Sequence, residues 1–327
     1  MKVIQVGIGG MGNVWLQTVL ESKRVEFAGF VEVNDAVIDA QVAKHGLDRN
    51  LVFPTLDAAL AAVQTDALIN VTPPQFHRDV SIRALEAGIP VLSEKPLAPT
   101  PAEAQEIVDT ANRTGVLHVV TQNYRYSTVA QTLKKALDPA VMGAIGALTV
   151  EFFKGPHFGG FREQMPYPLI VDMSIHHFDM MRFFLGADPV SVFGRSWNPP
   201  WSWFSGDASA SVSLEFSGGL TASYTGTWCG TGRETPWNGD WRFDCENGVV
   251  ALSNDQVWVY PRQHDEQPQQ VEPVAMPLVA QAYLLDEFCM AVEGGATPAT
   301  TCQDNIKSLG IVFSAVESFE TGEVVRV

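Results

Sequence analysis

The chain has 327 residues, of which 46% are hydrophobic and 18% are charged, and its formal net charge at pH 7 is -16. This length exceeds what one ordinary core holds, so two domains are expected, and the composition is that of a folded globular protein rather than a disordered chain. The acidic balance argues against nucleic acid or an anionic membrane as a partner, because phosphate groups are held mainly by clusters of Lys and Arg.

The four cysteines, Cys229, Cys245, Cys289 and Cys302, lie far apart and form no C-x-x-C pair. That spacing favours reduced thiols over a zinc or redox site. A predicted strand begins at residue 2, which leaves no room for a signal peptide. No run approaches the ~18 apolar residues of a membrane span. We therefore expect a cytoplasmic protein.

The predicted elements begin with a strand over residues 3–6, a glycine-rich turn and a helix over residues 15–22. Glycines at G-x-G-x-x-G spacing permit a tight turn, close approach of a pyrophosphate and close packing of helix on strand. The amides at the helix start then face the phosphates. Alone, the motif also fits a turn that binds nothing, but between a strand and a helix it predicts a dinucleotide site. The residues assigned to this site are Gly7, Ile8, Gly9, Gly10, Met11 and Gly12.

From this turn to about Asn123, short apolar strands alternate with helical segments. The alternation predicts an α/β domain with a doubly wound parallel sheet of the Rossmann type. One helix start is well marked, with Thr100 as N-cap, Pro101 in the first position and Glu103 completing a capping box. The further predicted strands are 25–33, 67–71, 90–92 and 117–121, and the further predicted helices are 36–45, 80–87 and 100–113.

After Asn123, β-rich runs follow one another with little helix between them, which implies a mixed or antiparallel sheet. We predict a Rossmann domain over residues 1–123 and a C-terminal α+β domain over residues 124–327, with a large open sheet and helices on one face. The last helices could pack back on the first domain. The predicted strands here are 147–153, 190–197, 208–216, 220–228, 241–245, 249–252, 257–260 and 324–327, and the helices are 128–137, 169–185, 278–292 and 304–319.

The uncovered face of such an open sheet needs a partner. A second copy of the chain can cover it, so we expect a homodimer or homotetramer that assembles through the C-terminal sheet.

Glu32 ends the second predicted strand, 20 residues after Gly12. A carboxylate there can accept hydrogen bonds from both hydroxyls of the adenosine ribose and would repel a 2'-phosphate. No Arg follows within ten residues to bind that phosphate. The sequence therefore predicts NAD in preference to NADP, the alternative being an ordinary solvated carboxylate at a strand end.

Two loops follow predicted parallel strands, whose carboxyl ends line the ligand crevice of such a sheet. One reads T-P-P-Q-F-H from Thr72 to His77, and the other reads E-K-P and contains Lys95. A neutral His77 that only holds the loop is as consistent with its helix-start position as a catalytic one. Burial would lower the pKa of Lys95 and Glu94 would raise it, and a surface lysine in a turn remains the alternative.

The predicted helix 169–185 carries a carboxylate four residues before an imidazole, namely Asp172 and His176. At 3.6 residues per turn these two share a face with Asp179, whereas His177 is turned away by about 100°. A carboxylate at this spacing can fix the tautomer of a general base. A dipole partner at the helix start and a core histidine remain open, and no metal is expected without a further ligand cluster.

Substrate contacts are less determined by the sequence. Arg162 precedes the helix and could meet a carboxylate or a hydroxyl, and His157 and Arg233 lie in neighbouring loops. Tryptophans of the second domain can stack on sugar rings, which suits a sugar or polyol, or they can fill a sheet face or an interface. They are Trp197, Trp201, Trp203, Trp228, Trp237 and Trp241.

Over its full length the chain resembles the Gfo/Idh/MocA family of oxidoreductases, which includes inositol and sugar dehydrogenases. The combination of E-K-P with D-x-x-x-H in a second domain is specific, although each motif alone is not. Glu32 stands where the family frequently has Asp, and Ser174 where it often has Gly. The further motifs that carry the resemblance are G-I-G-G-M-G, T-P-P-x-x-H, N-Y-R from residue 123, and the closing T-C-Q-D-N-I-K-S-L and E-T-G.

The resemblance implies NAD or NADP as cofactor and hydride transfer between the nicotinamide and a secondary alcohol or ketone of a sugar, inositol or related polyol. It implies Lys95, Asp172 and His176 as the catalytic residues, with Arg162 as a further substrate contact suggested by position. Two other functions stay open, a glycosidase or lyase with transient oxidation by NAD and a non-catalytic sensor that binds NAD(P). Near the cofactor the resemblance places Thr72, Pro73, His77, Glu94, Lys95 and Asn123.

Overall fold

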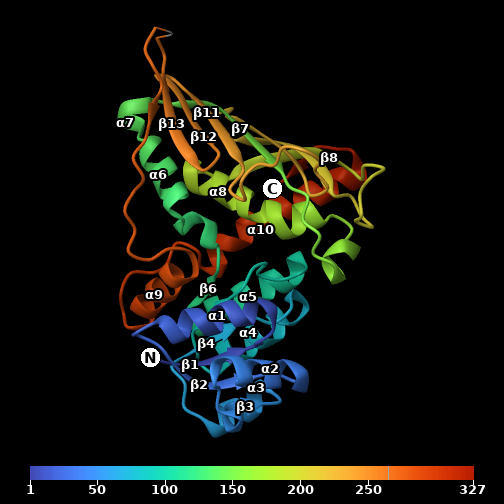
Figure 1. Ribbon diagram of the computed structural model, residues 1–327, viewed down its shortest axis with the longest axis vertical. Helices are drawn as coiled ribbons and strands as arrows, with labels where there is room; N and C mark the ends of the chain where they lie inside the picture. The colour runs from blue at the N-terminus through green and yellow to red at the C-terminus, as the bar shows by residue number, and fades with distance from the viewer. Residues whose placement is uncertain (264) are drawn as a thin grey trace. The chain divides into compact units, whose positions relative to one another are not determined.

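The computed structural model describes residues 1–263 and 265–327, which form two compact units (Figure 1). Unit 1 comprises Met1–Asn123 and Leu278–Ile306, and unit 2 comprises Tyr124–Pro277 and Lys307–Val327. The range 124–327 predicted as one domain therefore contains a segment that the structure places in unit 1. Each unit is built on its own sheet and is described by itself.

Unit 1 contains a six-stranded sheet in the order β3-β2-β1-β4-β5-β6, and all of its strand pairs are parallel. The strand order reverses between β1 and β4, the point at which doubly wound sheets bind their ligands. The predicted Rossmann-type sheet is confirmed. The strands are β1 (Lys2–Val6), β2 (Glu26–Val31), β3 (Val52–Phe53), β4 (Ala67–Asn70), β5 (Val91–Ser93) and β6 (His118–Val120).

The helices of unit 1 follow the predicted pattern except where an element is very short. β3 and α3 were missed because two-residue strands and seven-residue helices carry too little periodicity to detect. Thr100 is the N-cap of α5, and its hydroxyl accepts from the amide of Glu103 at 3.3 Å, which is one half of the predicted capping box. The other half differs, because the Glu103 carboxylate accepts from the Thr100 hydroxyl at 2.7 Å and not from the Thr100 amide. The helices are α1 (Gly10–Glu21), α2 (Asp35–His45), α3 (Leu56–Ala62), α4 (His77–Glu86), α5 (Pro101–Thr114) and α9 (Ala280–Val292).

Helix α9 comes from late in the chain and packs against α1 in unit 1. Leu285 and Phe288 join a buried core with Val3 and Trp15. At the rim of this contact, Arg24 of the α1–β2 connection pairs with Asp286 at 3.0 Å. Apolar burial therefore accounts for the return of this helix to the first unit.

Unit 2 contains a nine-stranded sheet in the order β14-β13-β12-β11-β7-β10-β9-β8-β15. Strands β7 and β10 pair in parallel and the remaining pairs are antiparallel, so the predicted mixed sheet is confirmed. The strands are β7 (Ile145–Phe153), β8 (Pro189–Trp197), β9 (Ser209–Phe216), β10 (Thr221–Thr227), β11 (Asp240–Cys245), β12 (Gly248–Ser253), β13 (Gln256–Pro261), β14 (Gln269–Gln270) and β15 (Val325–Arg326).

The helices of unit 2 lie on one side of this sheet, with α6, α8 and α10 beneath it in Figure 1. Burial alternates along β9 and β10, so that Val212 and Tyr224 are buried while Ser211 and Ser223 are exposed. The face away from the helices is thus polar. The helical segments are η3 (Asn123–Tyr126), α6 (Thr128–Ala136), α7 (Pro139–Met142), η4 (Gly160–Gln164), η5 (Leu169–Ser174), α8 (Ile175–Leu185) and α10 (Cys302–Thr321), whose first residues belong to unit 1.

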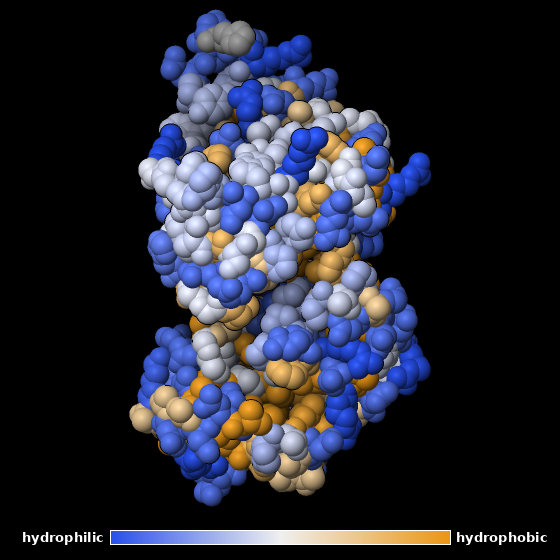
Figure 2. All heavy atoms as spheres, turned by 90° about the vertical axis from the view of Figure 1, so that its right-hand side faces the viewer, coloured by the Kyte–Doolittle hydropathy of each residue, from blue (hydrophilic) through white to orange (hydrophobic). Residues whose placement is uncertain are grey.

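No helix within residues 1–263 and 265–327 is long and apolar enough to cross a bilayer. Figure 2 shows apolar atoms gathered on one face of unit 1. The exposed large apolar side chains of this unit include Met11 and Val14 at the start of α1, and Val33 just after β2. Apolar surface beside the glycine-rich turn suits the planar rings of a dinucleotide.

Candidate active site

The glycine-rich turn joins β1 to α1, and its glycines meet different steric demands. Gly7 has φ +89°, and a Cβ there would lie 2.6 Å from the carbonyl oxygen of Val71. A Cβ on Gly12 would lie 2.5 Å from the carbonyl oxygen of Gly7. No atom lies within 4 Å of a Cβ built on Gly9 or Gly10. The outer glycines are therefore needed for packing, whereas the middle ones leave an open approach to the helix start.

The N-terminus of α1 is suited to bind an anion. Its N-cap, Gly9, supplies no side-chain hydrogen bond, and the first turn contains no acidic residue. The first amides of the helix thus remain for a phosphate, which the helix dipole also favours. Together with the open space over Gly9, this donor set fits the pyrophosphate of a dinucleotide.

Gln5 of β1 holds the glycine-rich turn in place, a role that was not predicted from the sequence. Its buried side-chain amide donates to the carbonyl of Gly7 at 3.0 Å and to that of Gly12 at 2.8 Å. A polar residue within an apolar strand was the available signal, because a buried amide requires hydrogen-bond partners.

Replacing Gly9 by Ala is expected to weaken binding of NAD without unfolding the protein. The new methyl group meets open space in the protein but occupies the approach of the pyrophosphate. We expect the Kd for NAD, measured by fluorescence quenching, to rise at least about tenfold. Gly12→Ala is the matched contrast, because its methyl group would strike the Gly7 carbonyl and lower the melting temperature. An unchanged Kd in a folded Gly9→Ala protein would contradict this role.

Glu32 follows β2 and faces the same turn. Its carboxylate accepts hydrogen bonds from the amides of Val33 at 2.8 Å, Asn34 at 3.1 Å and Ile8 at 3.3 Å. The side chain of Ile8 is fully buried in the core, so only its backbone faces the turn, whereas Met11 is exposed. The amides fix the carboxylate of Glu32 beside the turn, where the predicted ribose contact requires it.

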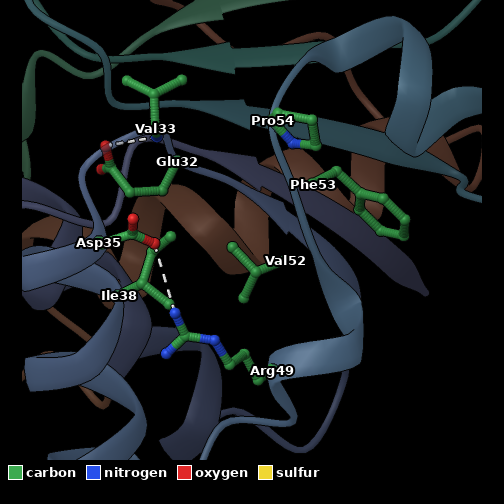
Figure 3. A pocket seen from close by; sticks show the side chains of 8 residues that line it. All are labelled: Glu32, Val33, Asp35, Ile38, Arg49, Val52, Phe53 and Pro54. Atoms are coloured by element: carbon green, nitrogen blue, oxygen red, sulfur yellow. Dashed lines mark hydrogen bonds and ion pairs between the residues drawn. The ribbon is translucent and has the colours of Figure 1, made fainter.

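A hollow of about 280 Å³ lies beside Glu32 (Figure 3). Arg49 lines this hollow, and its guanidinium pairs with the carboxylate of Asp35 at 3.3 Å and with that of Asp39. Arg49 follows Glu32 by 17 residues, outside the ten that the sequence argument considered. Two carboxylates hold this guanidinium, so it is not presented as a free cation to a 2'-phosphate. The residues that line the hollow are Glu32, Val33, Asp35, Ile38, Arg49, Val52, Phe53 and Pro54.

His77 ties together the two loops that follow β4 and β5. The imidazole is fully buried, with Nδ1 2.7 Å from the carbonyl oxygen of Pro96 and Nε2 2.8 Å from that of Thr72. Burial lowers the pKa of His77. The neutral ring has one N–H, so it donates to one of these two carbonyl oxygens and packs against the other. The side chain holds the two loops together, which is the alternative role that its position in the sequence left open. Thr72 itself is fixed by a 2.7 Å hydrogen bond from its hydroxyl to Asn70, and Pro73 beside it is exposed.

Glu94 also points into the protein. Its carboxylate accepts from the indole of Trp15 at 2.7 Å and from the amide of Lys95 at 3.2 Å, and burial raises the pKa of Glu94. The carboxylate therefore anchors the E-K-P loop to α1. Lys95 is half-buried and precedes a cis peptide bond to Pro96. Asn123 is half-buried and closes the first segment of unit 1.

In unit 2, Asp172 and His176 lie where a π-helical turn, η5, runs into α8. The sequence predicts one continuous α-helix over residues 169–185, whereas the structure has a wider π-helical turn over Leu169–Ser174 before α8. Single π turns are rare and often occur at functional sites. The Ser174 hydroxyl lies 3.1 Å from the carbonyl oxygen of Leu169, to which it can donate, and 2.9 Å from the hydroxyl of Tyr224. At the position where the resemblance predicts Gly, this serine bridges the wide turn and the sheet.

Arg162 binds the Asp172 carboxylate directly. Its Nε donates to Oδ2 at 2.7 Å, and its guanidinium lies over the rings of Phe158 and Phe161 at 5.4 and 5.0 Å. The Asp172 side chain is 16% exposed. Arg162 thus contacts the site through Asp172.

His176 and His177 have separate surroundings, as their spacing predicted. His176 is buried and stacks on the ring of Tyr124, with centroids 4.4 Å apart and planes 23° apart. His177 is fully buried, with Nδ1 3.3 Å from the hydroxyl of Tyr224 and Nε2 3.4 Å from the carbonyl of Trp237. Burial lowers the pKa of His177 to about 4. His177 is therefore a neutral core residue at physiological pH.

The buried His177 is expected to make unit 2 sensitive to acid. Its pKa is about 4 in the folded protein and about 6.5 in an unfolded chain, so the unfolded chain binds the additional proton between these values. The free energy of unfolding should therefore fall as the pH falls, by about 2 kcal/mol between pH 6.5 and pH 5 from this group. Urea titrations at both pH values measure the loss, and His177→Gln should reduce it. Equal losses in both proteins would contradict the assignment.

Asp179 does not join Asp172 and His176 as a chemical group. Its carboxylate is almost fully buried and receives two hydrogen bonds from Arg125, each of 2.6 Å.

The tryptophans of unit 2 fall into two groups. Trp228 and Trp241 are core residues, with 1% and 2% of their surface exposed, whereas others are open to solvent. The open ones are Trp197, Trp201 and Trp237, and Trp203 stacks on the exposed His157.

The candidate residues of each unit are described separately. The glycine turn, Glu32 and Lys95 lie in unit 1, and Asp172, His176 and Arg162 lie in unit 2. Within residues 1–263 and 265–327, no three His, Cys, Asp or Glu side chains gather as metal ligands.

Comparison with known proteins places both units in one family. Residues 1–122 match the oxidoreductase family with an NAD-binding Rossmann fold, and residues 130–251 match the Gfo/Idh/MocA C-terminal domain. The uncharacterized protein y4oX of Sinorhizobium fredii is 29% identical over 100% of this chain and 95% of its own, and inositol 2-dehydrogenase of Rhizobium meliloti is 25% identical over 96% and 95%. A solved oxidoreductase from Agrobacterium radiobacter, in complex with NAD+, L-tartaric acid and magnesium, superimposes with a TM-score of 0.89 at 20% identity, covering 100% and 98% of the two chains. The chain therefore belongs to the Gfo/Idh/MocA family of oxidoreductases, whose N-terminal domain is an NAD-binding Rossmann fold.

Proposed function

We propose that this oxidoreductase moves a hydride between NAD and a secondary alcohol, or its ketone, of a sugar, inositol or related polyol. The observation that carries the proposal is the arrangement at the start of α8. There Asp172, held by Arg162 at 2.7 Å, precedes the buried imidazole of His176 by one helical turn. A fixed carboxylate next to an imidazole is the arrangement of a general base.

Each residue has a distinct role in the proposed reaction. His176 removes the hydroxyl proton of the alcohol, and the carboxylate of Asp172 orients His176. Lys95 donates a hydrogen bond to the substrate oxygen as negative charge develops there. NAD, when bound, accepts the hydride released from the carbinol carbon.

The residues of unit 1 hold the dinucleotide in this proposal. The first amides of α1 bind the pyrophosphate over Gly9, and Glu32 accepts hydrogen bonds from the ribose hydroxyls. Since Arg49 is occupied by Asp35 and Asp39, the hollow offers a 2'-phosphate little compensation for the charge of Glu32. We therefore infer a preference for NAD over NADP.

Two observations support a polyhydroxy substrate. Relatives over nearly the whole chain include an inositol 2-dehydrogenase and the 1,5-anhydro-D-fructose reductase of Ensifer adhaerens. In unit 2, the exposed Trp237 and the aromatic rings around Arg162 offer faces on which a sugar ring can stack.

A panel of inositols, sugars and sugar acids, each tested with NAD and with NADP at 340 nm, tests the proposal. Stoichiometric NADH formation with at least one polyol, and a lower KM for NAD than for NADP, are the expected results. Product formation without accumulated NADH would indicate transient oxidation, as in a glycosidase or lyase. Binding of NAD without turnover of any compound would favour a sensor.

We also propose that the open face of the nine-stranded sheet is covered by a second copy of the chain. This face carries small hydroxyl side chains such as Ser211, Ser223 and Thr225, and close approach of another sheet needs such short side chains. Light scattering at micromolar concentration should give the mass of a homodimer or homotetramer. A monomeric mass would contradict the proposal.

A further inference from the structure

Tyr124 contacts the imidazole that the proposed function treats as the base. The two rings are stacked, with centroids 4.4 Å apart and planes 23° apart. Burial, and secondarily the negative charges of Asp172 and Asp255, raise the pKa of Tyr124 to about 12. The phenol therefore stays protonated at physiological pH and does not itself exchange a proton with a substrate. Its ring, rather than its ionisation, is the part that can act on His176.

An ion pair anchors the residues next to both rings. Arg125 follows Tyr124 in the turn η3, and Asp179 lies three residues after His176 on α8. Nε and Nη2 of Arg125 donate to the two oxygens of Asp179 at 2.6 Å each, and the side chains are 6% and 1% exposed. A bidentate pair of this kind fixes direction as well as distance.

The anchor continues into the last helix of unit 2. Ser308 of α10 donates to Oδ1 of Asp179 at 2.6 Å, and Arg182 donates to the Ser308 hydroxyl at 2.7 Å. On the other side, Gln131 donates to the carbonyl of Arg125 at 2.7 Å. A buried pair of charges contributes little stability compared with apolar residues of the same volume. The presence of this buried ion pair is therefore better explained by the fixed geometry that it gives to Tyr124 and α8 than by a gain in stability.

We propose that Tyr124 is a positioning residue that holds the imidazole of His176 through ring stacking, and that the buried pair of Arg125 and Asp179 holds Tyr124 in place. This inference rests on the proposed function, since it assigns the base role to His176. The N-Y-R segment then has a second role besides the predicted cofactor contact of Asn123, namely to hold the imidazole of His176.

Stacking affects the base in two ways. The χ2 rotation of a histidine has no sharp rotamer preference, so a flat contact on one ring face restricts it. The face of a tyrosine ring also attracts a cation, which favours the imidazolium formed when His176 takes a proton. The charged and titratable groups near the stacked pair include the ion pairs of Asp172 with Arg162 and of Asp179 with Arg125. They also include Asp255, in the turn after β12, and His177, whose ring lies edge-on to that of Tyr124 with centroids 6.5 Å apart. A substitution of Tyr124 leaves all of these charged residues in place.

The test compares Tyr124→Leu with Tyr124→Phe in the full-length enzyme with NAD and a substrate from the panel. Leu removes the aromatic face, and we expect kcat to fall about tenfold with KM changed less, and the acidic limb of kcat/KM to move down by about half a pH unit. Phe keeps the face and should keep the wild-type pH profile. If the Leu protein does not fold, Tyr124→Met replaces it.

A double variant tests the anchor separately. Arg125→Met with Asp179→Leu exchanges the buried charges for apolar side chains, a change that folded proteins tolerate. We expect a folded enzyme whose acidic limb is displaced as in Tyr124→Leu. A wild-type pH profile in Tyr124→Leu overturns the positioning role of Tyr124, and a wild-type profile in the double variant overturns the role of the ion pair. Full activity of His176→Ala would instead overturn the proposed function itself, so the failures are distinguishable.

Discussion

His176→Ala is expected to lower kcat for alcohol oxidation by about two orders of magnitude or more, the scale associated with loss of a general base. The imidazole is buried and stacks on Tyr124, and Arg162 holds the carboxylate of Asp172, four residues earlier in the chain. The neighbouring His177 cannot replace it, because its ring is directed into the core. Initial rates of NADH formation measure the effect.

Two controls separate this chemical role from a structural one. The Kd for NAD should stay near the wild-type value in His176→Ala, because the glycine turn and Glu32 belong to unit 1. Added imidazole should restore part of the activity to His176→Ala. Turnover at the wild-type rate, without added imidazole, would refute the assignment of the base.

Lys95→Ala is expected to lower kcat to a similar extent, again about two orders of magnitude. The loop that carries Lys95 is fixed from both sides, by Glu94 on Trp15 and by His77 on the carbonyl of Pro96. The ammonium group can therefore be removed without loss of the loop itself. Rates and KM values for NAD and substrate check this, and kcat should fall far more than the KM for NAD rises.

His77→Gln provides the contrast to Lys95→Ala. It leaves the ammonium group in the protein but releases the carbonyls of Thr72 and Pro96, so we expect a lower melting temperature of unit 1 together with lower activity. Added ethylamine should raise the rate of Lys95→Ala and not that of His77→Gln. An enzyme without Lys95 that retains its full rate would contradict the role of the ammonium group.

The sequence patterns predicted the elements well where each element was long. The strand and helix around the glycine turn, the helix capped by Thr100 and the strands of the mixed sheet all appear near their predicted positions. Local signals such as glycine spacing, period-two alternation and N-cap residues determine these elements. The short β3 and the π turn at Asp172 lack such signals. Helix α3 has the N-cap Thr55, but its seven residues are too few to show a clear period.

Side-chain roles were harder to predict. The sequence places Glu94 and His77 in motifs and Arg162 in a loop before the site. In the structure, Glu94 and His77 hold loops in place and Arg162 holds Asp172. A motif predicts where a residue lies in the chain but not the direction of its side chain. The direction depends on partners far along the chain, such as Trp15 for Glu94, 79 residues away.

The sequence by itself determined that the chain begins with a dinucleotide-binding turn and contains a carboxylate one helical turn before an imidazole. Both features depend on neighbours in the chain, so short-range geometry is sufficient to predict them. Only the tertiary structure decided that Gly9 faces open space, that Arg49 is held by two carboxylates, and that Tyr124 covers His176. These are contacts between segments distant in sequence, and packing of the folded chain alone brings such segments together.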